Sequence, residues 1–141
     1  MNKKQVILAA LMIVIGTALV QAQTFYPALK GYSAAAKEQL DKTYATLLNS
    51  RDNKYIENAL ATVAMIKLDL PADEFPMIQN KIDTIAAHGA TPAIQYRASL
   101  VKEVFTKTAI FKEEAARHYD TTDAFFGAIA QRAALASART N

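Results

Sequence analysis

The sequence predicts an all-α domain of five or six amphipathic helices that pair as antiparallel hairpins. Beyond residue 33, apolar side chains recur three or four positions apart, which is the period of one helix face. Most glycines and prolines fall between these periodic segments rather than inside them. Two-residue alternation, the pattern of a half-buried strand, does not extend over any useful length.

Residues 1–22 precede this domain and have the three parts of a secretory signal. Two lysines stand near the start, an apolar run follows over residues 6–20, and Val20 and Ala22 form the cleavage motif. We therefore expect cleavage after Ala22 and an exported product, either periplasmic or secreted. The alternative is an uncleaved membrane anchor, although the apolar run is slightly shorter than a comfortable bilayer span.

Without the leader, 141 − 22 = 119 residues remain, which is enough for one domain with a single core. Two of the 16 Lys and Arg residues lie in the leader, so 14 basic residues face 13 acidic ones. A nucleic-acid partner therefore has no basic stripe to support it. The sequence contains no cysteine, so we expect no disulfide, no thiolate metal site and no lipid anchor after cleavage.

The first two helices of the domain are marked by their capping residues. We expect residues 23–32 to lie extended against the domain, and Ser33 to cap a helix that runs to about Asn49. The turn-forming cluster at 49–53 then places Asp52 or Asn53 to cap a second helix, which ends near Leu70. The apolar stripe of the first helix is Ala36, Leu40, Tyr44, Leu47 and Leu48, and that of the second is Ile56, Ala59, Leu60, Val63, Ile66 and Leu70.

The third and fourth helices form the central hairpin. The third begins near residues 73–75, with Pro76 in its first turn, and ends where Gly89 can adopt the left-handed conformation. Thr91 can cap the fourth helix, and Pro92 suits its first turn. The two stripes are Phe75, Ile78, Ile82 and Ile85, followed by Ile94, Ala98, Val101 and Phe105.

A break at residues 106–108 separates the central hairpin from the last part of the domain, which spans residues 33–137 as a whole. A shorter fifth helix would end near His118 and Tyr119, and residues 120–123 offer several caps for a last helix. Residues 138–141 should fray. The fifth helix would contain Ile110, Phe111, Ala115 and Arg117, and the last would bury Phe125, Phe126, Ile129 and Ala133.

Two stretches of the chain, 47–56 and 85–94, share one organisation at an offset of 85 − 47 = 38 residues. Each stretch ends one helix and opens the next, and this offset is close to the repeat length of stacked helix pairs. Over residues 36–105 the chain resembles HEAT-repeat proteins, in which a short polar turn leads to an inner helix rich in alanine. An arginine-bearing inner helix of this kind is visible at residues 96–100, whereas its counterpart at 57–60 lacks the arginine.

The resemblance implies a short curved stack of about two units that binds another protein through one face and has no catalytic residues. The alternative is a plain bundle of five or six helices, because every helical hairpin needs caps and an apolar stripe.

Three residues are candidates for an interaction face. Tyr55 and Tyr96 lie near the starts of the second and fourth helices, slightly off the apolar stripes, where they would share an exposed edge with Arg97. Tyrosine and arginine are favoured anchors of protein interfaces. The alternative is that both rings pack at the core margin with only the hydroxyl groups in water.

A metal site is a weaker hypothesis. Glu114 and His118 are four residues apart on one predicted helix face, but the chain offers no second pair to complete the ligand set. The only other histidine, His88, is explained by the last turn of a helix. Glu113 and Arg117 are spaced as an exposed ion pair. We therefore expect no catalytic residue, no cofactor and no metal.

These observations predict a small exported protein without enzymatic activity that acts as a protein-interaction or structural module. One alternative is a module that binds a small apolar ligand such as a lipid, with space left between alanine-lined helices such as residues 128–138. The other is a metal-binding protein or hydrolase that uses Glu114 and His118.

Overall fold

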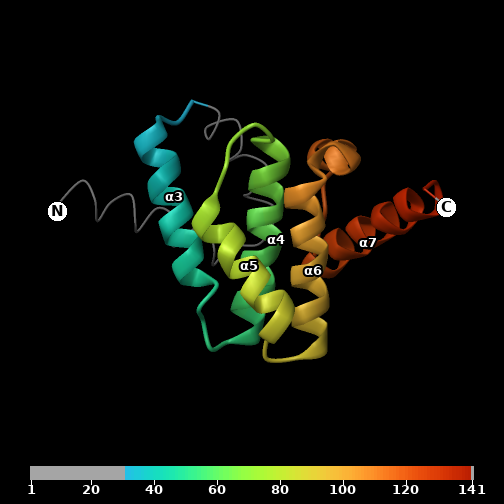
Figure 1. Cartoon of the computed structure of the whole chain (residues 1–141), viewed down its shortest axis with the longest axis horizontal. Coiled ribbons are helices and arrows are strands. Elements are labelled where there is room, and N and C mark those ends of the chain that lie inside the picture. Colours follow the sequence, from blue (N-terminus) through green and yellow to red (C-terminus); the bar gives the residue numbers. More distant parts are fainter. Residues whose placement is uncertain (1–30, 141) are drawn as a thin grey trace.

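The computed structural model describes residues 31–140, so the predicted leader and residues 23–30 of the predicted extended segment lie outside the described part. Within residues 31–140 the chain is all-α and has no strand, which confirms the predicted fold class (Figure 1). The elements are α3 (Ala34–Leu47), α4 (Asn53–Asp69), α5 (Pro76–His88), α6 (Pro92–Thr106), the 3-10 helix η1 (Thr108–Ala116) and α7 (Thr122–Ala138).

The first four of these helices form two hairpins that lie side by side. Within the hairpins, α3 packs on α4 and α5 packs on α6, and between the hairpins α3 contacts α5 while α4 contacts α6. Figure 1 shows that α3 and α5 run in one direction and α4 and α6 in the other. Neighbours of different hairpins are therefore parallel, whereas an up-and-down bundle would have antiparallel neighbours throughout.

The core is centred on α4, which contacts α3, α6, α7 and η1. Because partners surround it, α4 is buried on almost every side, including small residues such as Ala61 and Ala64. Full burial of one large apolar side chain stabilises the fold by about 1.5 to 3 kcal/mol. The largest fully buried side chains are Tyr44, Phe75, Phe111, Phe125, Leu40, Leu60, Ile66, Ile78, Ile82, Ile94 and Ile129.

The predicted helix caps are confirmed by side-chain hydrogen bonds to backbone amides of the first turns. The side chain of Ser33 accepts a hydrogen bond from the backbone amide of Ala36 at 3.2 Å, and that of Asp52 accepts one from Lys54 at 2.9 Å. Thr91 accepts from the amide of Ile94 at 3.2 Å. Each cap satisfies a backbone donor that the first turn of a helix leaves free. Pro76 and Pro92 occupy the first positions of α5 and α6.

Gly89 ends α5 as predicted, but the predicted left-handed backbone conformation was wrong. Its backbone has φ −57° and ψ 156°, which is not left-handed and is open to any residue. Space requires the glycine instead, because an added Cβ would lie 2.7 Å from the carbonyl oxygen of Ile85 and 3.1 Å from the side chain of Ile94. The turn between α5 and α6 is therefore so tight that any side chain at position 89 would collide with its neighbours.

The predicted fifth helix is a 3-10 helix that ends at Ala116, before the predicted end at residues 118–119. Three residues per turn place Phe111 and Glu114 on the same side, and both are buried. Ala115, which the prediction placed in this helix, is exposed.

The last helix, α7, leaves the body of the domain. Its first half packs against α4, α6 and η1 through Phe125, Phe126 and Ile129, as predicted. Figure 1 shows its second half extending beyond the hairpins toward the C-terminus. Residues 134–140 are accordingly exposed, apart from the half-buried Ala136.

Candidate functional site

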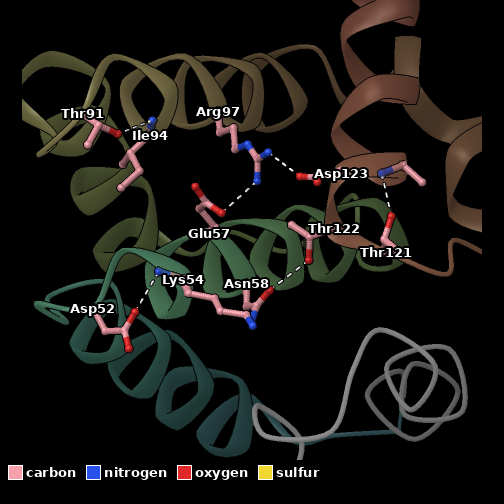
Figure 2. Close-up of polar contacts among 11 residues, drawn as sticks. Asp52, Lys54, Glu57, Asn58, Thr91, Ile94, Arg97, Thr121, Thr122 and Asp123 are labelled. Atoms are coloured by element: carbon pink, nitrogen blue, oxygen red, sulfur yellow. Dashed lines mark hydrogen bonds and ion pairs between the residues drawn. The ribbon is translucent and has the colours of Figure 1, made fainter.

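The helix starts of α4, α6 and α7 meet at a cluster of polar side chains that we name the Arg97 junction, consisting of Arg97, Glu57, Asp123, Asn58 and Thr122 (Figure 2). The guanidinium of Arg97 lies 3.1 Å from a carboxylate oxygen of Glu57 and 2.5 Å from one of Asp123. Thr122 donates a hydrogen bond of 2.9 Å to the side-chain carbonyl of Asn58. One residue of α6 is thus ion-paired with both α4 and α7.

The local sequence explains why these side chains meet. Asp52, Thr91 and Thr121 cap the three helices and fix where each begins, so Glu57, Arg97 and Asp123 fall in the first two turns. The guanidinium also lies 5.0 Å from the ring centre of Phe126, close enough for a cation–π contact. Planar Arg can bridge two carboxylates and stack on a ring at the same time, which Lys cannot do.

The two candidate tyrosines are exposed at the end of the hairpins where the junction lies. The side chain of Tyr55 is 49% exposed and that of Tyr96 is 58% exposed. α4 and α6 are neighbours that start at the same end of the hairpins, at the bottom of Figure 1. Arg97 behaves differently, because its side chain is only 20% exposed and points toward α4 and α7. It holds the helices that carry the tyrosines.

A depression borders Tyr55. It has a volume of about 400 Å³ and lies where the α3–α4 turn meets the first turn of α4. It opens broadly to solvent and carries both polar and apolar groups on its walls, a form that suits a protruding side chain of a partner better than an enclosed ligand. Its lining residues are Thr46, Leu47, Asn49, Ser50, Asp52 and Tyr55.

Glu114 and His118 contact different side chains. Because η1 is a 3-10 helix that ends at Ala116, the predicted shared helix face does not form. Glu114 is buried and accepts hydrogen bonds from the hydroxyl of Tyr119 and, at 2.9 and 3.2 Å, from Arg132. His118 lies 3.1 Å from a carboxylate oxygen of Asp120. Over residues 31–140, no three side chains of the metal-binding types are grouped to hold an ion.

The predicted ion pair between Glu113 and Arg117 is replaced by another arrangement. Glu113 pairs with Arg132 of α7 at 2.7 Å, and Arg117 lies 3.7 Å from Glu114. The contact of Glu113 with Arg132 ties η1 to α7. The contact of Arg117 with Glu114 joins residues three positions apart, the spacing at which side chains share one side of a 3-10 helix.

Glu114 is held as a carboxylate by its surroundings. Burial raises the pKa of this group. Hydrogen bonds from Tyr119 and Arg132, together with the charges of Arg117 and Arg132, lower the pKa by more than burial raises it, so the pKa lies below its ordinary value. Burial and the neighbouring Glu114 raise the pKa of Tyr119 to about 12. A carboxylate that stays ionised and a phenol that stays protonated suit a structural tie better than acid–base chemistry near pH 7.

Sequence reasoning missed two buried charged residues. Asp41, which is not part of the apolar stripe of the first helix, accepts hydrogen bonds from the backbone amides of Met77 and Ile78 at 3.1 and 2.8 Å. Lys67 donates to the carbonyl oxygens of Pro71 and Asp73 at 3.0 and 2.7 Å. One signal could have pointed to Asp41: Phe75, directly before Pro76, has no side chain that can accept a hydrogen bond, so a helix starting at Pro76 needs an acceptor from elsewhere.

The fold and the junction together define a class of protein, a small all-α protein built on two stacked hairpins. Ion pairs join its last helix, α7, to α6 and to η1. No family model, curated protein or solved structure matches the chain. No helix in the described range, residues 31–140, is both long enough and apolar enough to cross a membrane.

Proposed function

We propose that this chain is a small exported helical module that binds another protein through the edge formed by Tyr55 and Tyr96. The observation that carries the proposal is that both tyrosines are about half exposed at the end of the hairpins where Arg97 ties α4 to α6. A rigid aromatic side chain loses little conformational entropy on binding and contributes a large contact area, so it is an effective anchor.

The way the hairpins stack supports a HEAT-like architecture as part of this proposal. Parallel packing of α3 on α5 and of α4 on α6 is the arrangement of consecutive helix pairs in a solenoid. In such a stack one layer is formed by the second helices, here α4 and α6, and these helices carry the two tyrosines. Export follows from the basic, apolar and small-residue pattern of residues 1–22.

The Arg97 junction contributes rigidity to the proposed face. Its two carboxylates neutralise the guanidinium, and Phe126 lies against it, so the junction is a positioning element rather than a contact for the partner. If α4 and α6 could slide past one another, the spacing of Tyr55 and Tyr96 would vary and binding would have to bear the cost of ordering them.

The experiment is a crosslinking capture from the exported fraction of the cells that produce the protein. We expect one partner to be captured repeatedly, and its capture to fall at least about tenfold with Tyr96→Ala while the melting temperature is unchanged. Met77→Ala is the matched control, because Met77 is 46% exposed but lies on α5. Equal loss with both variants would contradict the assignment of the face.

The two rival functions give different outcomes in the same preparation. A lipid-binding module would carry a bound apolar ligand and gain thermal stability when lipid is added. A metal protein would carry stoichiometric metal that is lost in Glu114→Gln. Either result, obtained with no captured partner, would overturn the interaction proposal.

A further inference from the structure

Among residues 31–140, the outer face of α7 is a further surface whose side chains are exposed. Taking Gln131 as its centre, a helix with 3.6 residues per turn places these side chains within about 100° of one another. All are exposed, and none is charged. We call this set the α7 face: Ala124, Gly127, Gln131, Ala134, Leu135 and Ala138.

Two members of the α7 face are not explained by contacts within the described residues. Leu135, in the second half of α7, is a large apolar residue that is 52% exposed. Gly127 lies in the interior of α7, where glycine costs about 1 kcal/mol relative to alanine. A Cβ at position 127 would meet nothing within 4 Å, so no neighbour in the chain requires the glycine. An apolar protrusion and a hollow therefore stand on the same face.

The positions of this protrusion and hollow are symmetric about Gln131. Gly127 lies 131 − 127 = 4 residues before the centre, and Leu135 lies 135 − 131 = 4 residues after it. In two antiparallel copies of α7 that cross at Gln131, Leu135 of each copy would face Gly127 of the other. This is the self-complementary contact that a two-fold dimer requires.

The charged residues near the two ends of α7 also favour the antiparallel pairing centred on Gln131. Asp123 and Arg139 lie 8 residues on either side of Gln131, and they have opposite charges. In the antiparallel pair Asp123 of one copy would approach Arg139 of the other, whereas a parallel pair would bring like charges together. Asp123 remains available because its side chain is 81% exposed even while it is paired with Arg97.

We infer that the occupant of the α7 face is a second copy of this chain, bound as an antiparallel α7–α7 pair centred on Gln131. A depression of about 220 Å³ beside the face, lined by Gln131, Leu135, Arg132 and Arg117 among others, offers space for one side chain of the crossing helix. A single helix pair is smaller than a standard stable interface, so the dimer dissociates in the micromolar range or above.

The test uses the full chain as purified from the cells that produce it, together with the natural absence of cysteine. A single Gln131→Cys substitution places the only thiol at the two-fold centre, where a short bis-maleimide should join two copies. Met77→Cys on α5 is the control, because Met77 is also exposed but lies outside the α7 face. We expect crosslinked dimer from Gln131→Cys and none above background from Met77→Cys.

A second substitution tests the contact itself. Gly127→Leu fills the hollow from an exposed helix position where an added Cβ meets no described atom within 4 Å, so we expect the fold to be preserved while dimerisation weakens by about tenfold or more. Sedimentation equilibrium up to millimolar concentration measures this loss. Equal crosslinking from positions 131 and 77, or an unchanged dimer in Gly127→Leu, would overturn the inference. A monomer whose Gln131→Cys thiol resists labelling would also overturn it, since another segment of the chain would then cover the face.

Discussion

The carboxylate of Asp41 in α3 caps the start of α5 by accepting a hydrogen bond of 2.8 Å from the backbone amide of Ile78. The two residues are 37 positions apart, and α5 has no side-chain cap of its own. The contact therefore joins the first hairpin to the second and satisfies backbone donors that burial would otherwise leave without partners.

Loss of this cap should destabilise the whole domain. We expect Asp41→Ala to lower the free energy of unfolding by about 2 to 3 kcal/mol, because buried amides of α5 lose a charged acceptor. Urea denaturation followed by circular dichroism measures the change. Glu38→Ala, on the same helix but exposed, is the control and should change stability by less than about 0.5 kcal/mol. Similar effects of both variants would show that the cap is not a stabilising contact.

The glycines at positions 89 and 127 should respond to alanine in opposite ways. Gly89→Ala forces a Cβ to within 2.7 Å of the carbonyl oxygen of Ile85 and should cost about 1 to 3 kcal/mol. Gly127→Ala enters open space inside a helix and should stabilise the monomer by up to about 1 kcal/mol. Thermal unfolding of dilute protein compares the two. Unchanged stability in Gly89→Ala would contradict the steric account of position 89, and a loss of stability in Gly127→Ala would contradict the open space at position 127.

The tie between η1 and α7 should weaken in acid. The pKa of Glu114 in the folded protein lies below its ordinary value of 4.5, so its contribution to stability is complete above that pH. It is lost as the pH falls through the lower folded pKa. We expect Glu114→Gln to cost about 2 to 3 kcal/mol at pH 7, and the difference from the natural chain to shrink steadily below pH 4.5.

Denaturation midpoints measured from pH 7 down to pH 3 check this prediction. A difference between Glu114→Gln and the natural chain that stays constant over the whole range would contradict the role of the charge.

The Arg97 junction should not tolerate lysine. Arg97→Lys keeps the positive charge but cannot hold Glu57 and Asp123 together while stacking on Phe126, so we expect a loss of about 1 to 2 kcal/mol. Arg51→Lys, at an exposed turn position, is the matched control. Hydrogen exchange of the first turns of α4 and α6 would locate the loosening. Unchanged exchange there would mean that apolar packing alone positions the two helices.

The local features of the fold were predictable, whereas the contacts between distant residues were not. Caps such as Asp52 and Thr91 act within a few residues, and the apolar stripes repeat with the helix period, so the sequence contains both signals. The bond from Asp41 to α5 and the bridge of Arg97 to Asp123 depend on which helices become neighbours. No periodic pattern encodes that choice, and buried charges look like surface charges until their partners are known.

The candidate site shows the same division. Tyr55 and Tyr96 could be singled out because they lie slightly off the apolar stripes, and exposure was the expected consequence. The position of Glu114 could not be predicted, because the sequence pattern suggested an α-helix where packing produces a 3-10 helix. That single change of helix type separates Glu114 from His118 and directs it to Arg132 instead.

The proposed interaction edge can be tested most directly by site-specific photocrosslinking in the cells that produce the protein. A photoreactive side chain would replace Tyr55, Tyr96 or Met77 in turn, three positions of similar exposure on different parts of the surface. We expect the same partner to be joined from positions 55 and 96 and not from 77. A partner joined equally from all three positions, or only from 77, would contradict the proposal that the start of α4 and α6 is the binding edge.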